Sequence, residues 1–585
     1  MNWETYTIKD LINEINNDKI VLPSLQRKYV WKPKQIENLF DSLMQGFPIG
    51  TFFFWRVSHK KLIGNMKFYE FFRQFNPKEN ENQDITKKII NKRNIVSVID
   101  GQQRITSLYI ALSGHYVIKK YKGRSSKKEN FQENHLYYNV MSSYYNRNKK
   151  EGNKFEFKFF PSDPMKNFTK SSKKVWVRLD SLIHHKSVVT FRKTVRKKLL
   201  NTESSDQKNF IKNHWESKGN LKQKLTDLWE MYNSESISYF TLQNTDLNDI
   251  VEIFIRVNNA GTQLSRTEML MSTVSAYWPE ARDKVDKLLK TINDKGFDFG
   301  VDFVMRSALV SFEGNVLYNP SSVSNIVKKI EEDWDKLQNS IIEATEMLKR
   351  YKYDAKSLTS KNAAIPLVYF VFKGGSIQGS SKEKNQQEEQ IKLYLRTALV
   401  TGMFGTHGDQ ALTAMRESMR KEVKEGVYEL RSKRFSYQKI AKHFSVQGKV
   451  KIVDRDYITE NILKLQYGNS AFPALVILFE GFPFNSEEFN QDHIFPKSSF
   501  MFENEEEFFE ANSIVNLQIL NARDNKIKQD IMPEQWIQGL KDKNKVQSEN
   551  YLPSNIKNEE FSDFYTKRYK ILLKKFEEAF HIKDI

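Results

Sequence analysis

Cysteine is missing from this sequence of 585 residues. Its absence excludes disulfide bonds, thiolate catalysis, zinc ribbons and iron–sulfur clusters, so any metal ion must be held by Asp, Glu, His or Asn side chains or by water. Long apolar runs are also missing, and no stretch reaches the roughly 18 residues that a membrane-spanning helix needs. The first residues are polar and acidic, which is not the pattern of a signal peptide. We therefore expect a cytoplasmic protein with no membrane partner.

The chain has fewer acidic than basic residues. The chain has 92 Lys and Arg against 72 Asp and Glu, which gives a net charge of +20 and a pI near 9.4. Such an excess suits a polyanionic partner, because each neutralised phosphate releases condensed counterions. A lysine-rich proteome would produce the same excess, so charge alone leaves both explanations open. The chain length, with 39% hydrophobic residues and a mean hydropathy of −0.62, predicts three or four globular domains.

Hydrophobic periodicity divides the chain into three parts and predicts a multidomain α+β protein. Residues 1–280 alternate helix and strand signals and contain a basic insertion at about 116–235. Residues 281–465 show long helical patterns, with a linker predicted at Gly374–Gln386, and residues 466–585 indicate a strand–loop–strand–helix unit with a closing amphipathic helix. The elements predicted in the first part are helices at 7–16, 34–45, 105–112 and 249–257 and strands at 20–23, 51–57 and 95–99.

Three basic runs lie in the insertion, around residues 119–128, 170–178 and 192–198. Aromatic side chains interleaved with cations are typical of nucleic-acid-binding surfaces, whereas a charge run by itself is more often a solvated face. Both interpretations stay open, and the candidate DNA contacts are Lys193, Lys197 and Lys198. The aromatic residues between the runs are Tyr137, Tyr138, Tyr144, Tyr145 and Trp176.

The C-terminal part contains an ordered set of polar residues. Asp492 and His493 end one predicted strand, Asn516 lies on a second predicted strand, and Asn525 is placed at the start of a helix. Hydrolysis of a phosphodiester with a metal ion needs a base for the attacking water and a cation at the phosphate. We assign His493 as the general base and Asp492 and Asn525 as ligands of Mg²⁺, which prefers oxygen. Asn516 would orient the His493 ring or hold the turn.

A second set, Asp100-Gly101-Gln102-Gln103-Arg104, follows the strand predicted at 95–99. A glycine between a strand end and a helix start leaves backbone N–H groups free, and the helix dipole there favours phosphate. Arg104 can bind phosphate through two hydrogen bonds, and Asp100 can hold a metal ion or polarise water. Gln102 and Gln103 can orient a ribose or a water molecule. Chemistry alone leaves a structural turn equally open, and the sequence has no Walker A motif.

The C-terminal segments resemble a known nuclease family. The segment DHIFPKS, followed by NSIVNLQIL and NARDNKIK, is similar to the HNH nuclease domain at the C-terminus of GmrSD-type (type IV) restriction enzymes, which recognise modified phage DNA. The resemblance implies a ββα-metal fold with base and metal roles on Asp492, His493 and Asn525. One departure is a long acidic loop between His493 and Asn516, whose outer part we do not expect to grip DNA.

The N-terminal segments resemble the same family. VLPSLQRKYVW, VIDGQQRITSL and IFIRVNNAGTQLSRTEML are similar to its ParB/sulfiredoxin-like domain. The resemblance implies binding and hydrolysis of a nucleoside triphosphate through Asp100–Arg104, with Asp100 and Arg104 in catalysis. It also implies that Gln26 and Arg27 lie beside the nucleotide, although Arg27 capping a turn is the alternative.

Together these observations lead to the hypothesis of a nucleotide-regulated endonuclease of phage defence. We expect it to use Mg²⁺ or Mn²⁺ and a nucleoside triphosphate, and to cut double-stranded, modified DNA. A homo-oligomer is compatible with the sequence. Two alternatives stay open: a ParB-like, nucleotide-switched DNA-binding regulator with an inactive nuclease fold, and an HNH nuclease directed at RNA.

Overall fold

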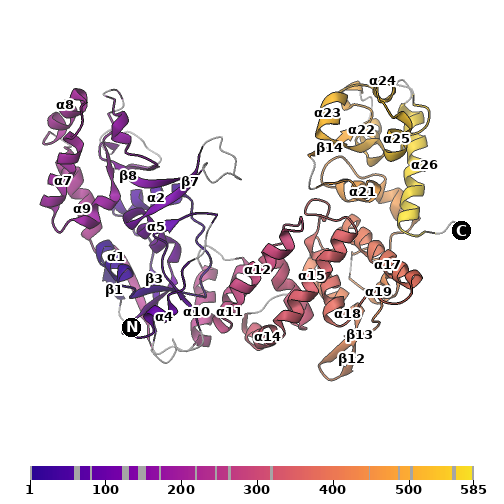
Figure 1. The fold of residues 1–585 in the computed structure, drawn as a ribbon, viewed down its shortest axis with the longest axis horizontal. Helices are drawn as coiled ribbons and strands as arrows, with labels where there is room; N and C mark the ends of the chain where they lie inside the picture. The colour runs from indigo at the N-terminus through magenta and orange to yellow at the C-terminus, as the bar shows by residue number, and fades with distance from the viewer. Residues whose placement is uncertain are drawn as a thin grey trace. The chain divides into compact units, whose positions relative to one another are not determined.

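The structure is a computed structural model that divides into two compact units, Met1–Glu280 and Ala281–Ile585 (Figure 1). Each unit is considered by itself. None of the helices that the structure describes is long and apolar enough to cross a membrane. The described residues are 3–57, 66–78, 82–120, 131–142, 153–169, 171, 173–217, 220–243, 247–260, 265–316, 320–446, 448–484, 488–500, 505–556 and 561–582.

A six-stranded mixed sheet forms the centre of the N-terminal unit, with strands in the order β1-β11-β3-β6-β2-β4. Strand β11 comes from far along the chain and lies between β1, which it pairs antiparallel, and β3, which it pairs parallel. The sheet is therefore complete only after the insertion has been crossed. The strands are β1 (Trp3–Tyr6), β2 (Ile20–Pro23), β3 (Phe52–Arg56), β4 (Phe68–Tyr69), β6 (Val96–Asp100) and β11 (Ile237–Leu242).

Helices cover both faces of this sheet because its strands are apolar on both sides. In β2, Ile20 and Leu22 belong to one buried cluster and Val21 to another, as the alternation of side chains along a strand requires. The first cluster includes residues of α1, α2 and α5, and the second includes residues of α10 and α11. The helices are α1 (Ile8–Asn16), α2 (Pro33–Met44), α4 (Thr86–Ile89), α5 (Gln102–Ser113), α10 (Leu247–Ala260) and α11 (Arg266–Tyr277).

The basic insertion folds as a second sheet and a group of helices. Strands β10, β8, β7 and β5 lie in that order, and β9 also pairs with β8. The expectation that its aromatic residues interleave with cations at a surface is wrong for Tyr137, Tyr138 and Trp176, which are buried in the core of this unit; Tyr144 and Tyr145 lie outside the described residues. The elements are β5 (Gln74–Phe75), β7 (His115–Lys119), β8 (Phe131–Asn139), β9 (Glu156–Phe160), β10 (Trp176–Arg178), α7 (Val188–Leu200), α8 (Ser205–His214) and α9 (Leu221–Asn233).

The first part of the C-terminal unit is almost entirely helical, as the sequence predicts. One difference is the linker expected at Gly374–Gln386, since α17 already begins at Ser381 behind a capping box formed by Ser380 and Glu383. The hairpin of β12 (Arg420–Lys424) and β13 (Val427–Leu430) is a second difference. The helices are α12 (Ala281–Asn293), α13 (Val301–Ser311), α14 (Pro320–Glu332), α15 (Trp334–Arg350), α16 (Ile365–Phe372), α17 (Ser381–Val400), α18 (Gly408–Met419), α19 (Tyr437–His443) and α20 (Arg455–Tyr457).

A two-stranded sheet followed by a helix forms the last part of the chain. Strand β14 pairs antiparallel with β15, and α23 follows β15 directly and contacts both strands. Asn516 lies in a short 3₁₀ turn just before β15 rather than on the strand itself, and a helix, α22, forms within the acidic loop. The elements are α21 (Phe472–Leu478), β14 (Phe489–His493), α22 (Glu505–Asn512), β15 (Leu517–Asn521), α23 (Ala522–Lys528), α24 (Pro533–Gln538), α25 (Lys543–Glu549) and α26 (Phe561–Ala579).

Arg568 of α26 fixes the turn that leads into β15. Its side chain is fully buried, and it donates hydrogen bonds to the carbonyl oxygens of Val515, of Ile514 at 3.3 Å, of Leu517 at 2.8 Å and of Asn550 at 3.1 Å. Burial lowers the pKa of Arg568 to about 9. The carbonyl groups that Arg568 contacts would otherwise be buried with too few hydrogen-bond donors. These hydrogen bonds offset the cost of burying its charge.

Replacing Arg568 should therefore destabilise the C-terminal part of the chain. Arg568→Met keeps the apolar length of the side chain and removes every donor, and each unsatisfied buried group costs roughly 1–3 kcal/mol. We expect the free energy of unfolding to fall by about 3 kcal/mol or more, measured by chemical denaturation. Lys567→Met is the matched control, because Lys567 is half exposed and only pairs with Asp563. Equal midpoints for the two variants would contradict the assigned role.

Candidate active sites

The His493 ring at the end of β14 is held in one orientation. Its Nε2 lies 3.3 Å from Oδ1 of Asn512, and the amide nitrogen of Asn512 donates to the carbonyl of Phe508 at 2.8 Å. Since the amide nitrogen is engaged, Oδ1 is the acceptor and Nε2 carries the proton, which leaves Nδ1 with a lone pair. Tyr467 stacks on the ring with a centroid distance of 4.9 Å.

Burial sets the protonation state of this histidine. It lowers the pKa of His493 from its ordinary value of 6.5, and the hydrogen bond to Asn512 opposes the shift without reversing it. The imidazole is therefore neutral at pH 7, which is the form that can accept a proton. The sequence points to His493, but Asn512 and Tyr467 as its supports emerge only from the structure.

Asp492 is buried next to a buried lysine that the sequence analysis did not identify. Its Oδ2 accepts a hydrogen bond from the side-chain amide of Gln518 at 2.7 Å and lies 3.0 Å from Nζ of Lys528, which is fully buried. The same ammonium group donates to the carbonyl of His493 at 2.7 Å. Burial raises the pKa of Asp492, and the charge of Lys528 opposes that shift. The ion pair with Lys528 thus stabilises the charged form of Asp492, which burial disfavours.

Asp492 offers a carboxylate oxygen, the kind of ligand that Mg²⁺ prefers. A carboxylate has about four lone-pair positions, and Gln518 and Lys528 leave part of Oδ1 available. Asn525 and Lys528 are three residues apart on α23 and so share one side of that helix. A carboxylate and an amide oxygen completed by water form the partial shell that Mg²⁺ accepts. The spacing of Lys528 behind Asn525 is the signal that could have revealed this lysine.

Asn516 holds the turn through hydrogen bonds to the backbone. It is fully buried, its amide nitrogen donates to the carbonyl groups of Phe495 at 3.0 Å and Ala511 at 2.8 Å, and its Oδ1 accepts from the N–H of Phe495 at 2.9 Å. Of the two roles expected for Asn516, the structural one agrees with these contacts. The catalytic assignment of Asn516 stays a prediction, and these bonds to the backbone favour the structural role.

In the N-terminal unit, one cavity of about 400 Å³ brings together all seven residues expected to bind nucleotide. The loop after β2 supplies two of them, and the turn between β6 and α5 supplies the other five. Phe254, Val257 and Asn258 of α10 and Trp31 complete the lining. The seven are Gln26, Arg27, Asp100, Gly101, Gln102, Gln103 and Arg104.

The turn before α5 presents the amino end of that helix to the cavity. Gly101 is its N-cap at φ 96°, a left-handed conformation that favours glycine. A Cβ at Gly101 would also meet the Phe52 ring at 2.2 Å. Gln102 follows, nearly buried, with an Oε1 that has no hydrogen-bond partner among the described residues. Free N–H groups and a positive dipole end make this a suitable place for an anion.

Arg104 has a structural task that the sequence did not predict. Its guanidinium donates to the carbonyl groups of Ile49 at 2.6 Å and Thr51 at 3.2 Å, pairs with Asp100 at 3.0 Å and lies over the Phe52 ring. These bonds use three of its five N–H groups. Most of the guanidinium therefore anchors the strand entry at β3, and its expected binding of phosphate stays a prediction.

Two glutamines of the predicted set hold the loop after β2 in place. Gln26 donates to the carbonyl groups of Val98 at 3.0 Å and Ile99 at 2.8 Å. Gln103 accepts from the N–H of Val30 at 2.9 Å. Arg27 projects from this loop into the cavity lining and pairs with Glu268 of α11 at 3.4 Å. Arg27 is thus the cation whose side chain the structure leaves most available to a ligand of this cavity.

The candidate DNA contacts on α7 do not form a single patch. Lys193, Lys197 and Lys198 are all exposed. Lys193 and Lys197 are four residues apart and share one side of the helix. Nζ of Lys198 lies 3.6 Å from Oδ2 of Asp163, which compensates its charge. Most of the run at 119–128, and Lys170 of the second run, lie outside the described residues.

Comparison with known proteins finds a similarity in the N-terminal region. Residues 8–275 match the family of GmrSD restriction endonuclease N-terminal domains. The match covers the six-stranded sheet apart from β1, the insertion and every residue that lines the cavity, and it supports a GmrSD-like restriction enzyme. The C-terminal unit lies outside the matched residues.

A curated relative with a shorter match is an uncharacterized protein from Methanocaldococcus jannaschii. The two chains are 28% identical over 112 residues, which is 19% of this chain and 18% of the relative. The chain therefore matches less than a fifth of that relative's length. The match of residues 8–275 to the GmrSD N-terminal domain family covers more of the chain than the match to this relative.

The contact between Gly50 and Arg104 in the GmrSD-type domain gives a test of how this cavity is built. A Cβ at Gly50 would lie 2.2 Å from Nη1 of Arg104, whereas a Cβ at Gly46 would meet nothing within 4 Å. Both glycines have positive φ, so Gly50→Ala and Gly46→Ala share the backbone strain and differ in the clash. We expect Gly50→Ala to cost about 1–3 kcal/mol more, measured by urea unfolding. Equal losses would show that Arg104 moves aside freely.

Proposed function

We propose that this protein is a metal-dependent endonuclease that cuts DNA, with an HNH-type nuclease centre in β14, β15 and α23. The observation that carries the proposal is the half-buried, neutral His493, held through Nε2 so that Nδ1 is available, directly after Asp492 in β14. A base and an oxygen ligand for the metal ion, here at successive positions of β14, are the two requirements of metal-assisted phosphodiester hydrolysis. The GmrSD-type domain in the same chain supports a role in restriction of phage DNA.

The residues of this centre divide the work. Nδ1 of His493 takes the proton of the attacking water, while Asn512 and Tyr467 keep the ring from turning. Asp492 and Asn525 would hold the Mg²⁺ ion. When bound, that ion supplies positive charge to the phosphate and to the departing oxygen. Lys528 keeps Asp492 ionised despite its burial and adds a second positive charge near the scissile phosphate.

The cavity of the GmrSD-type domain is proposed to bind a nucleoside triphosphate. The amino end of α5 would receive a phosphate, and Arg27 would exchange part of its pairing with Glu268 for a second phosphate. We also propose that the N-terminal domain, which contains this cavity, has a ParB/sulfiredoxin-like fold. Nucleotide state would regulate the nuclease, because an unregulated nuclease centre would also cut the DNA of its own cell.

Double-stranded, modified DNA is the proposed substrate. The net charge of +20 favours a polyanion, and Lys193 and Lys197 are exposed cations that could contact phosphates. An inactive, purely regulatory nuclease fold is less well supported, because His493, the proposed base, and Asp492, the proposed metal ligand, are both present and held in place by hydrogen bonds. An RNA substrate would use the same chemistry, so the test below includes RNA.

His493→Ala should abolish cutting while the fold is retained. Loss of a general base costs roughly 10²–10⁴-fold in rate, and we expect this loss in Mg²⁺-dependent nicking of plain and modified plasmid DNA. His443→Ala is the control, since His443 is exposed at the end of α19. Parallel assays with single-stranded RNA identify the preferred polymer. Nicking by pure His493→Ala at the rate of the control would exclude this centre as the source of activity.

Arg27→Ala should weaken nucleotide binding. A hydrogen bond to a charged group contributes about 1.5–3 kcal/mol, so the affinity for ATP or GTP with Mg²⁺ should fall about tenfold or more in calorimetric titration. Lys28→Ala is the matched control, because the neighbouring Lys28 is not among the residues that line the cavity. Unchanged affinity in Arg27→Ala, with the same Kd as the control, would argue that the nucleotide binds elsewhere.

A further inference from the structure

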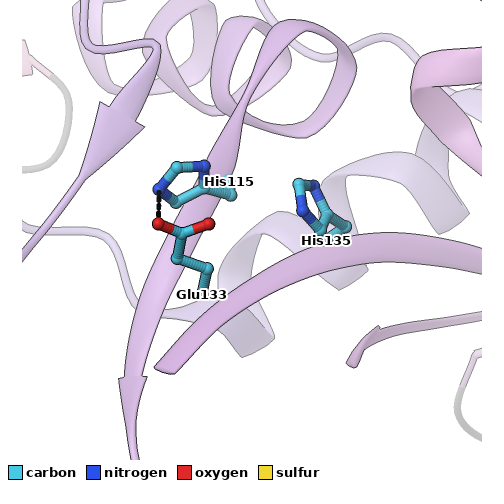
Figure 2. Close-up of side chains that lie close together, drawn as sticks. All are labelled: His115, Glu133 and His135. Carbon is cyan, nitrogen blue, oxygen red and sulfur yellow. Dashed lines mark ion pairs between the residues drawn. The ribbon is translucent and has the colours of Figure 1, made fainter. Parts of the chain in front are cut away.

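Three potential metal ligands meet on one side of the second sheet, far in sequence from the nuclease centre. Strands β7 and β8 pair antiparallel, with Tyr116 opposite Asn134 and Val117 opposite Glu133. The same register sets His115 opposite His135. Side chains of directly opposite residues, and of residues two apart on one strand, share a face of the sheet. The pairing of the strands therefore brings His115, His135 and Glu133 together (Figure 2).

The spacing of the three groups suits a single small cation. One ligand atom from each lies within 4.8 Å of the others. Nε2 of His115 is 3.5 Å from Oε1 of Glu133, and the two imidazole rings have centroids 5.7 Å apart. Tetrahedral ligands about 2.0–2.1 Å from zinc lie about 3.3–3.5 Å from one another. Small rotations of the three side chains would bring their ligand atoms from separations of up to 4.8 Å to the spacing of a zinc site.

The ring of His135 is already oriented as a metal ligand requires. Its Nδ1 lies 3.0 Å from the carbonyl oxygen of Gly114, which can only accept, so Nδ1 carries the proton and Nε2 has the free lone pair. Histidine ligands of metal ions usually donate their other ring N–H to a carbonyl or carboxylate in this way. Gly114 is itself fixed, since a Cβ there would lie 1.6 Å from the carbonyl oxygen of Arg73.

The local charges are compatible with a divalent ion. Burial lowers the pKa of both His115 and His135, which keeps the imidazoles in their neutral, metal-binding form. Arg178 is the nearby cation, and its guanidinium is paired with Asp180 at 2.5 Å. The carboxylate of Glu133 adds a negative charge beside the two imidazoles, which favours a cation between the three groups.

We propose that His115, Glu133 and His135 bind one zinc-like divalent transition-metal ion, with water as the fourth ligand. Two imidazoles and one carboxylate favour zinc and its neighbours over Mg²⁺. The ion would cross-link β7 to β8 and so brace the insertion of the GmrSD-type domain. This site is separate from the nuclease centre and does not depend on the proposed cutting of DNA.

Metal content of the full-length protein tests this proposal. Chelator-treated protein is reloaded with Zn²⁺, dialysed and measured by mass spectrometry, and Co²⁺ loading is followed by visible absorption, which reports tetrahedral geometry. Since His493 could also hold zinc, the His493→Ala chain is the reference background. In that background we expect one equivalent of zinc, a tetrahedral Co²⁺ spectrum and a higher Tm with zinc than without.

In the same background, His135→Ala should lose the bound zinc, the Co²⁺ spectrum and the rise in Tm. Glu133→Gln keeps the size of an exposed side chain, so it should fold normally and bind zinc about 10–100-fold more weakly. His443→Ala is the control for removing an exposed histidine and should match the reference. The proposal is overturned if the reference chain binds no zinc, or if both His135→Ala and Glu133→Gln bind zinc as tightly as the reference.

Discussion

Buried backbone groups at the functional turns must find hydrogen-bond partners, and side chains supply them. An unpaired buried carbonyl or N–H costs as much as a lost hydrogen bond. Arg104 and Gln26 meet this requirement in the N-terminal unit, where they bind the carbonyl groups of residues 49, 51, 98 and 99. Asn516 and Arg568 meet it in the C-terminal unit, where they bind the carbonyl groups of residues 495, 511 and 517. Both candidate sites rest on these bonds.

This requirement separates two kinds of polar residue within each motif. Those that satisfy the backbone are buried and fully engaged, as Asn516 is, and they position the loop. Those left with free capacity face the cavity or the strand end, as Arg27 and the Nδ1 atom of His493 do. Lys528 belongs to both kinds, since it binds the carbonyl of His493 and also keeps Asp492 ionised. Motif membership alone does not distinguish these roles.

Local sequence patterns were sufficient to predict most of the helices and strands. The strand predicted at 20–23 is β2, and the helix predicted at 34–45 is α2 to within one residue at each end. Their periodicity is strong, and the helix is followed by glycine and proline. The linker predicted at Gly374–Gln386 extends too far, because Ser380 and Glu383 form a capping box that starts α17 at Ser381. Trp176 and its neighbours were misassigned because burial depends on the second sheet.

The sequence by itself determined the residue types of both motifs, the alternation that forms the strands and the absence of thiolate chemistry. Tertiary structure decided which side chains meet. Strand register placed His135 opposite His115, and helix packing placed Lys528 against Asp492. It also engaged Arg104 with the backbone around β3. Spacing along the chain defines only neighbours within a few residues, whereas register and packing bring together groups that are tens of residues apart.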